Sequence, residues 1–152
     1  MATIERTLVI VKPDAVQRGI AGEILARYER RGLKIAAGRF ATVTSAQAQE
    51  HYGEHEGKPF FAGLVSYITS SPSFLLVLEG PDAVAITRTT NGATKPADSA
   101  PGTIRGDFGM TIANNLVHAS DSVESANREL GIFFADGGIV EYERAIDKWI
   151  LE

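Results

Sequence analysis

The sequence predicts an α+β sandwich in which a β-sheet packs against helices in a split βαβ order. Short apolar runs typical of buried strands alternate with segments of helical periodicity, and Gly or Pro residues punctuate them. The chain has 152 residues, of which 44% are hydrophobic and 22% charged, and no internal repeat is visible. We therefore expect a single domain over residues 1–152, with helices on one side of the sheet.

The first third of the chain predicts a strand, a helix and a second strand. Residues 7–11 form a β-branched run that Lys12-Pro13 closes, which is typical of a buried strand. Residues 20–31 place apolar side chains on one helical face, and Gly32 follows where a helix-ending glycine belongs. Alternating residues after Gly32 predict a second strand over 33–43.

The middle of the chain predicts further helices around a central strand. Thr44, with Gln47 three residues later, is a capping-box start for a short helix that ends near residue 51. Residues 59–68 predict another apolar helix. The uninterrupted apolar run 74–78 predicts a central strand that is covered on both faces. Pro81-Asp82 then starts a helix that runs to about residue 90.

Regular periodicity is lost from residue 91 to about residue 114, a stretch rich in Gly and Pro. A connection of this length in a compact domain is usually functional or disordered. Residues 117–118 predict the edge of a short strand, and Asp121 is placed to cap a helix whose last apolar position is residue 133. We expect an irregular tail over 139–152. Two of its apolar side chains are expected to dock on another surface, namely Trp149 and Ile150.

Composition excludes several functional classes. The 15 Lys+Arg against 19 Asp+Glu give a net charge of −4, which argues against a general nucleic-acid binder. With no cysteine, a disulfide framework or a zinc–thiolate site cannot form. The apolar runs are far shorter than the roughly 20 residues that span a bilayer, and residues 1–6 show no signal-peptide pattern. We expect no membrane contact and a cytoplasmic location.

Three cations fall at or beside the ends of predicted elements and could bind an anion: Lys12, Arg88 and Arg105. Each also has an ordinary interpretation: a solvated lysine at a strand end, an exposed helix arginine, and an arginine in a salt bridge to Asp107 or another carboxylate. The glycines around Arg105 allow close backbone approach, and a guanidinium suits phosphate oxygens. The sequence has neither G-x-x-x-x-G-K-[ST] nor G-x-G-x-x-G, so phosphate must be handled by side chains.

His118 is the histidine best placed for chemistry, since polar groups flank it just before a predicted helix. Ser120, Asp121 and Glu129 could orient its ring, which would then act as a nucleophile. A hydrolytic triad based on Ser120 is a competing idea, although no G-x-S-x-G motif supports it. The spacing of His51 and His55 could indicate a metal pair, but Gly53 weakens the helix that would hold them, so we predict no metal ligands.

The segment Asn115-Leu116-Val117-His118-Ala119-Ser120-Asp121 closely resembles the active-site signature of nucleoside diphosphate kinases. The resemblance covers nearly the whole chain, through Val11-Lys12-Pro13-Asp14, His51-Tyr52, Lys58 to Phe61, Gly92-Ala93-Thr94, Pro101 to Phe108, and Ser122 to Glu129. It implies a ferredoxin-like domain whose four-stranded antiparallel sheet is covered by helices. It also implies ping-pong transfer of the terminal phosphoryl group from a nucleoside triphosphate, mainly ATP, to a nucleoside diphosphate through a phosphohistidine at His118. Mg²⁺ would arrive with the nucleotide phosphates, and the chain would form a homo-oligomer, a hexamer or a tetramer built from dimers.

The resemblance also implies roles for individual residues. Phosphates would be bound by Lys12, Arg88, Thr94 and Arg105. The base would stack on Phe60, with Ile112 on its other face, and Asn115 would reach the sugar and phosphate. The imidazole would be oriented by Ser120 and Glu129, and Tyr52 would brace the His118 region through its hydroxyl.

The chain departs from the family pattern beside the histidine. Ala119 stands where the family normally has Gly, and Ala113-Asn114 stands where it commonly has Gly-Arg. A positive φ at residue 119 would make alanine cost about 1–2 kcal/mol. If the position instead requires only close packing, the methyl group would shift His118 or narrow the site. No chemical group is lost, so we expect activity. Two alternatives remain: a nucleotide-binding regulator made inactive by Ala119, and a nucleic-acid-binding module, which the net charge disfavours.

Overall fold

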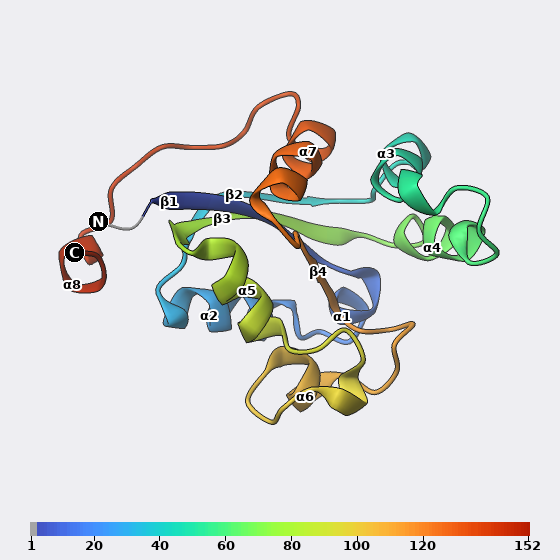
Figure 1. Ribbon diagram of the computed structural model, residues 1–152, viewed down its shortest axis with the longest axis horizontal. Coiled ribbons are helices and arrows are strands. Elements are labelled where there is room, and N and C mark those ends of the chain that lie inside the picture. Colours follow the sequence, from blue (N-terminus) through green and yellow to red (C-terminus); the bar gives the residue numbers. More distant parts are fainter. Residues whose placement is uncertain (1–2) are drawn as a thin grey trace.

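The computed structural model of the chain describes residues 3–152 and is built on an antiparallel sheet with strand order β2-β3-β1-β4 (Figure 1). The strands are β1 (Ile4–Val11), β2 (Lys34–Ala41), β3 (Ser73–Pro81) and β4 (Val117–Ala119). The central pair, β1 and β3, is matched along its whole length, whereas β4 pairs with β1 through three residues only. This confirms the predicted α+β class and the short edge strand before residue 120.

Helices cover both faces of the sheet (Figure 1). One layer holds α1 (Pro13–Gln17), α2 (Ala21–Arg31), α5 (Ala83–Asn91) and α6 (Ile104–Phe108), and the other holds α3 (Ser45–His51), α4 (Phe61–Ile68) and α7 (Val123–Phe133). The expectation that helices lie on one side was therefore wrong. Helical periodicity shows that a helix has an apolar face, but it does not show which side of the sheet that face will cover.

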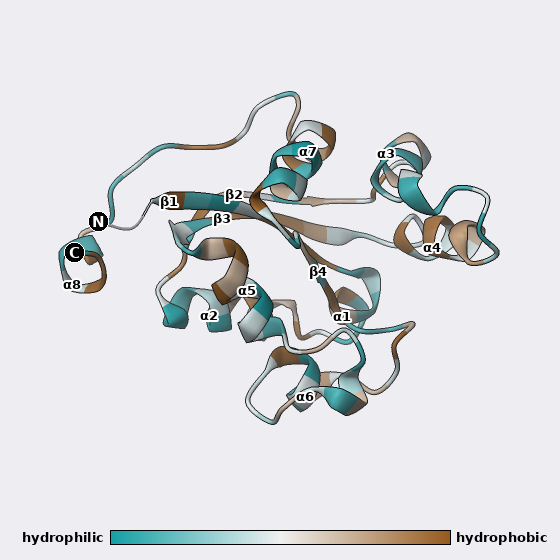
Figure 2. Ribbon diagram, in the orientation of Figure 1, coloured by the Kyte–Doolittle hydropathy of each residue, from teal (hydrophilic) through white to brown (hydrophobic). Residues whose placement is uncertain are grey.

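Alternation along β1 creates the two cores. Val9 and Val11 point into the layer of α2 and α5, while Leu8 and Ile10 point into the layer of α3 and α7, and all four are fully buried. Figure 2 shows the outward turns of α2 in hydrophilic colours and much of α4 in hydrophobic ones. The same alternation in β4 sends Val117 and Ala119 into the first layer, so the side chain between them faces the second.

Two local signals at helix ends are confirmed, those at Thr44 and Gly32. Thr44 begins α3 with a reciprocal capping box: its side chain accepts from the Gln47 amide, and the Gln47 side chain accepts from the Thr44 amide. Gly32 ends α2 in the left-handed region, with φ of 108°, as a glycine at this position does.

The glycine- and proline-rich stretch is more regular than expected, because it holds a 3-10 turn, η2 (Pro96–Asp98), and α6. The hydroxyl of Thr103 caps α6 by accepting from the Gly106 amide at 3.0 Å. Gly106 is needed there, since a Cβ would lie 2.0 Å from the Ala100 carbonyl oxygen. The predicted cap of α7 was one residue off: Ser122, not Asp121, accepts from the Ser125 amide.

The tail contains one helical turn, α8 (Asp147–Ile150), and β2 ends at Ala41, before the predicted residue 43. Trp149 is 80% exposed, so its expected docking is not seen within residues 3–152. Ile150 does lie against Gly32. Among the described residues, no helix is both long and apolar enough to cross a membrane.

Candidate active site

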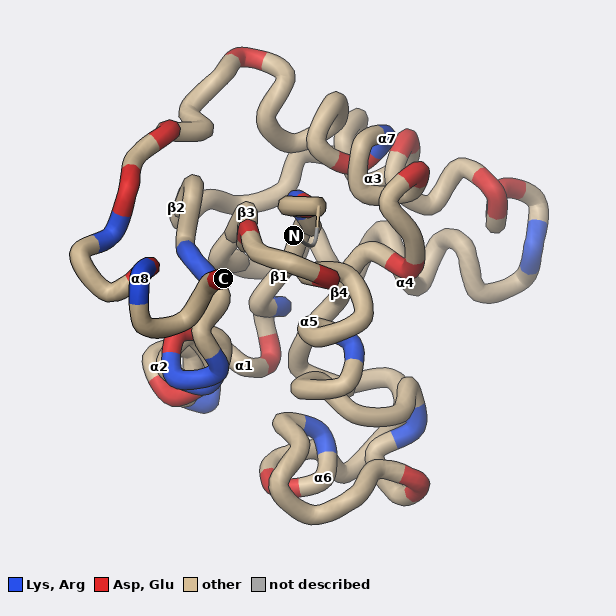
Figure 3. The backbone as a smooth tube through the Cα atoms, turned by 60° about the vertical axis from the view of Figure 1, so that its left-hand side comes forward, with Lys and Arg blue, Asp and Glu red and all other residues tan. Residues whose placement is uncertain are grey.

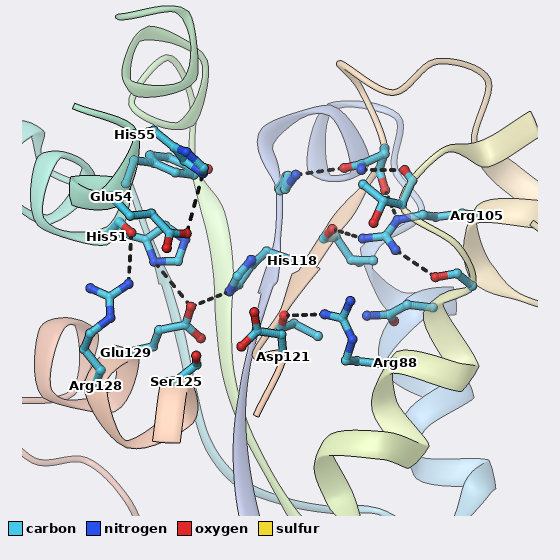
Figure 4. A pocket seen from close by; sticks show the side chains of 18 residues that line it. His51, Glu54, His55, Arg88, Arg105, His118, Asp121, Ser125, Arg128 and Glu129 are labelled. Atoms are coloured by element: carbon cyan, nitrogen blue, oxygen red, sulfur yellow. Dashed lines mark hydrogen bonds and ion pairs between the residues drawn. The ribbon is translucent and has the colours of Figure 1, made fainter. Parts of the chain in front are cut away.

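The His118 side chain leaves β4 toward α3 and α7, opposite the buried Val117 and Ala119. Its Nε2 lies 2.9 Å from Oε2 of Glu129, which the first turns of α7 place on the buried face of that helix (Figure 4). Nδ1 of His118 has no hydrogen-bond partner within residues 3–152. Because a carboxylate favours a proton on the nitrogen that faces it, the geometry leaves the lone pair on Nδ1.

Glu129 is itself held in place. Its Oε1 accepts a hydrogen bond from the Ser120 hydroxyl at 2.5 Å, and that hydroxyl accepts in turn from the Leu8 amide. Burial alone raises the pKa of Glu129, but the hydrogen bonds from His118 and Ser120 outweigh burial, so this pKa lies below its ordinary value. Glu129 therefore stays ionised, and Ser120 acts on the imidazole through this carboxylate.

Two aromatic residues enclose the imidazole on the α3 side. The His51 ring meets the His118 ring edge to face, at 4.6 Å between centroids and 89° between planes. Burial and the neighbouring His118 lower the pKa of His51 to about 3, so His51 is neutral near pH 7. Tyr52 packs against His51, and burial raises the pKa of Tyr52 to about 12. The contact of Tyr52 with this wall is made by its ring, and no hydrogen bond from its hydroxyl, the group expected to brace the site, is found within residues 3–152.

Arginines from the other layer form the opposite wall (Figure 4). Arg105 is buried, and its guanidinium donates to the carbonyls of Gly92 at 3.0 Å, Asn115 at 3.1 Å and Val117 at 2.6 Å. The alternative pairing of Arg105 with Asp107 is wrong, since Asp107 pairs with Arg27 at 2.5 Å. Arg88, on the last turn of α5, donates to the carbonyl of Ala119.

Lys12 completes the cationic side, at the point where Pro13 ends β1. Its Nζ donates to Oδ1 of Asn115 at 2.8 Å, and Nδ2 of Asn115 donates to the carbonyl of Thr94. Burial, and next the positive charge of Arg105, lower the pKa of Lys12 to about 8. A lysine that is desolvated beside another cation is well suited to bind an anion, because the anion restores the lost interactions.

These groups line one cavity of about 400 Å³. The predicted residues that line it are Lys12, Tyr52, Arg88, Thr94, Arg105, Asn115, His118 and Glu129. Phe60 and Ile112 lie outside the lining and are 51% and 59% exposed, while Ser120 is buried behind Glu129. Acidic and basic residues are interspersed along most of the chain (Figure 3). The grouping of Lys12, Arg88 and Arg105 in this cavity is therefore a local concentration of positive charge in a chain whose net charge is −4.

A metal ion is the other ligand that these groups suggest. His51, His118 and Glu129 carry nitrogen and oxygen atoms within 4.8 Å of one another. Both oxygens of Glu129, however, already accept hydrogen bonds, from Ser120 and His118. The arrangement therefore favours support of an imidazole over a metal site, and His55 is not part of the cluster.

Comparisons with known proteins show which family the chain belongs to. The sequence model described as "Nucleoside diphosphate kinase" matches residues 5–139. A nucleoside diphosphate kinase of Herpetosiphon aurantiacus is 54% identical over 149 residues, which are 98% of this chain and 100% of the relative. The chain belongs to the nucleoside diphosphate kinase family.

Solved structures of the family agree with this assignment and with the ferredoxin-like fold. A halophilic nucleoside diphosphate kinase from Halobacterium salinarum, solved in complex with CDP, superposes with a TM-score of 0.95 at 49% identity. The superposition covers 99% of this chain and 100% of the Halobacterium salinarum chain. A nucleoside diphosphate kinase family protein from Babesia bovis has a TM-score of 0.94 at 48% identity, with 97% and 99% covered.

The departure of this nucleoside diphosphate kinase from the family pattern at residue 119 carries no backbone strain. Among the described residues, the non-glycine positions with positive φ are Asp82 and Leu116, and Ala119 is not one of them. The methyl group of Ala119 packs into the core beside Val117, away from the His118 side chain. Backbone strain is therefore no reason to expect an inactive regulator, although Ala119 itself lines the cavity.

Some cavity residues were missed by sequence reasoning: His51 as a direct neighbour of His118, and Glu54, His55, Ser125 and Arg128. Arg128 donates to the backbone carbonyls of Glu50 and His51, and so ties α7 to α3. His51 and Tyr52 are adjacent in the sequence and precede a polar segment, but no local pattern indicated that His51 lies next to His118. These contacts depend on how two distant helices dock on the sheet.

Proposed function

We propose that His118 carries the phosphoryl group in a ping-pong exchange between a nucleoside triphosphate and a nucleoside diphosphate, with the whole chain acting as one domain. The observation that carries the proposal is the pairing of Nε2 with Glu129, which leaves Nδ1 unpartnered in a cavity with cations on its opposite wall. Nδ1 attacks the terminal phosphorus, the bond to the bridging oxygen breaks, and the nucleoside diphosphate leaves. The incoming diphosphate then attacks that phosphorus, and the N–P bond breaks.

Each wall has a separate part in this reaction. Arg88, Arg105 and Lys12 offset the negative charge of the phosphates, which is the main demand of phosphoryl transfer. Positive charge develops on the imidazole as the N–P bond forms, and Glu129 stabilises it through Nε2–H. Thr94 and Asn115 lie on the cationic side, where they can bind phosphate and sugar.

Mg²⁺ is part of the nucleotide substrate in this proposal. The Glu129 carboxylate is engaged by His118 and Ser120, so it is not free to serve as a metal ligand. Asp121 and Glu54 line the cavity and could accept hydrogen bonds from water on the ion. The ion would neutralise phosphate charge and would be held mainly by phosphate oxygens and water.

Phe60 and Ile112 remain our candidates for the base. Both side chains are exposed and apolar, and Phe60 rests against His55 at 5.1 Å between ring centroids. Stacking tolerates every base, since each has a π face, and this supports broad nucleotide specificity. The CDP bound by the Halobacterium salinarum relative is consistent with a pyrimidine diphosphate as one acceptor.

We also propose a homo-oligomer, a hexamer or tetramer built from dimers, in the cytoplasm. The edge strand β2 exposes Phe40, and Trp149 and Ile146 are exposed on the tail. Exposed apolar side chains on an edge strand are typical of a surface that another copy covers. The lack of cysteine in the sequence suits a reducing compartment.

Incubation with γ-labelled ATP tests the function directly. The enzyme is expected to take up acid-labile label at one site per chain and to discharge it when GDP is added. Nucleotide binding without any label would instead indicate a regulator. Labelled nucleic acid offered in parallel is expected not to bind, in keeping with the charge of −4.

The lowered pKa of Lys12 predicts how nucleotide binding depends on pH. Lys12 is charged below its pKa of about 8, so affinity for a nucleoside diphosphate should weaken as pH rises through that value. The bound phosphates favour the charged lysine, so binding above this pKa should take up a proton. Calorimetry at about pH 8.5 in two buffers of different ionisation enthalpy measures this uptake. Lys12→Arg is the control that stays charged and should take up none; equal uptake by both proteins would contradict the assignment.

A further inference from the structure

The residue two positions before His118 has a strained backbone. Leu116 is fully buried and has φ of 75°, and the Val117 amide donates to the Asn115 carbonyl at 2.9 Å across it. This is the rarer form of γ-turn, which a bulky residue such as leucine adopts only when its surroundings impose it. Strain of this kind next to reacting groups points to a positioning role.

Both backbone groups of Leu116 are held by the segment that follows β1. The Leu116 amide donates to Oδ2 of Asp14 at 3.1 Å, and the Lys12 amide donates to the Leu116 carbonyl at 2.9 Å. The other oxygen of Asp14 accepts a hydrogen bond from the Tyr67 hydroxyl. Asp14 is therefore anchored on one side and clamps the turn on the other.

The clamped turn supports the cationic wall. Its flanking carbonyls, those of Asn115 and Val117, accept from Nε and Nη2 of Arg105. The side chain of Asn115 accepts from Nζ of Lys12 and donates to Thr94. If the turn relaxed, Arg105 and Lys12 would lose the hydrogen-bond acceptors that fix their positions. His118 would shift as well, because it follows Leu116 by only two residues.

We propose that Asp14 is a positioning residue for phosphoryl transfer: its carboxylate holds the strained turn at Leu116 and so aligns the phosphate-binding groups with His118. The proposal rests on the proposed function of His118. Asp14 itself does not line the cavity, so it acts through the turn and not on the substrate.

The negative charge of Asp14 offers a second explanation for any effect of this residue on phosphoryl transfer, because it acts on Lys12. Burial and Arg105 lower the pKa of Lys12, and the negative charge of Asp14 opposes them. Asp14→Asn separates the two accounts, because its amide oxygen can still accept from the Leu116 amide while the charge is lost. Asp14→Ala removes both. Asp98→Ala is a matched control, since Asp98 is exposed and its side chain makes no hydrogen bond within residues 3–152.

The experiment measures single-turnover phosphorylation of each variant at saturating ATP, and ADP affinity separately. Asp14→Ala is expected to slow phosphorylation by about tenfold to a hundredfold. ADP affinity should change by less than about threefold, since most phosphate and base contacts remain. Asp14→Asn and Asp98→Ala should both stay within about threefold of the parent rate. The proposed positioning role of Asp14 would be contradicted if Asp14→Asn were as slow as Asp14→Ala, or if Asp14→Ala reacted at the parent rate.

Amide hydrogen exchange gives a readout that does not depend on catalysis. The Leu116 amide should exchange at least about tenfold faster in Asp14→Ala and stay protected in Asp14→Asn. Unchanged protection in Asp14→Ala would overturn the clamp, and the Asn variant still decides the question if the Ala variant folds poorly. Failure of the proposed function would look different: the parent protein would take up no label, while the Leu116 amide would still respond to Asp14.

Discussion

His118→Gln is expected to abolish uptake of label from γ-labelled ATP and to lower turnover by about 10⁴-fold or more, the scale seen when a catalytic nucleophile is removed. Glutamine supplies no nucleophilic ring nitrogen. It leaves the opposite wall intact, including Lys12, Arg88 and Arg105, so ADP affinity should change little. Acid-labile label and equilibrium binding, measured on the same preparation, check both parts.

His55→Gln is the matched control for this substitution. His55 stands at the rim of the same cavity, but its ring is not hydrogen-bonded to Glu129 and pairs with Glu54 at 3.6 Å. It should still be labelled. If His118→Gln were labelled as fast as its parent, another residue would have to be the acceptor.

Glu129→Gln is expected to slow phosphorylation by about 10²–10⁴-fold, by comparison with the loss of the orienting carboxylate in Ser–His–Asp sites. The amide cannot stabilise the positive charge that develops on the ring. Its NH₂ group can also turn toward Nε2, which moves the ring proton to Nδ1 and removes the attacking lone pair. ADP affinity should be nearly unchanged, because Glu129 lies on the wall of His118 and not among the cations.

Rapid-quench kinetics measure this loss, and nitrogen NMR of the imidazole reports which nitrogen carries the proton. Glu124→Gln, on the same helix but exposed, is the matched control and should retain the parent rate. A Glu129→Gln enzyme within about threefold of its parent would show that the carboxylate is not needed to orient or charge the imidazole.

Local sequence signals predicted those parts of the fold whose causes are local. Thr44 and Gln47 lie within one helical turn and satisfy each other, and Gly32 takes a backbone conformation that few other residues take. The run 74–78 predicted β3 because a strand buried on both faces needs no alternation. The sequence pattern alone named Ser120 and Glu129 as partners of His118 and picked out the three cations. It was the resemblance, which extends along the chain, that joined them into one site and added Tyr52, Thr94 and Asn115.

What the sequence did not predict depends on contacts between distant segments. The layer that each helix joins is decided by packing on the sheet, so the second helical layer was missed. α6 has five residues and depends on the Thr103 cap and on close approach to Ala100 at Gly106, neither of which has a periodic signature. His51 is buried because α3 and α7 dock together, an arrangement that its neighbours in sequence do not encode.

The placement of helices on both faces of the sheet has a consequence for how activity is acquired during folding. The nucleophile and its carboxylate belong to the layer of α3 and α7, whereas Arg88 and Arg105 come from the layer of α5 and α6. A partly folded chain that had the sheet and only one layer would have either an oriented imidazole without the arginines that offset phosphate charge, or those arginines beside a His118 that lacks Glu129. Recovery of phosphotransfer after denaturation should therefore report the last layer to assemble, and it should lag behind the return of helical signal.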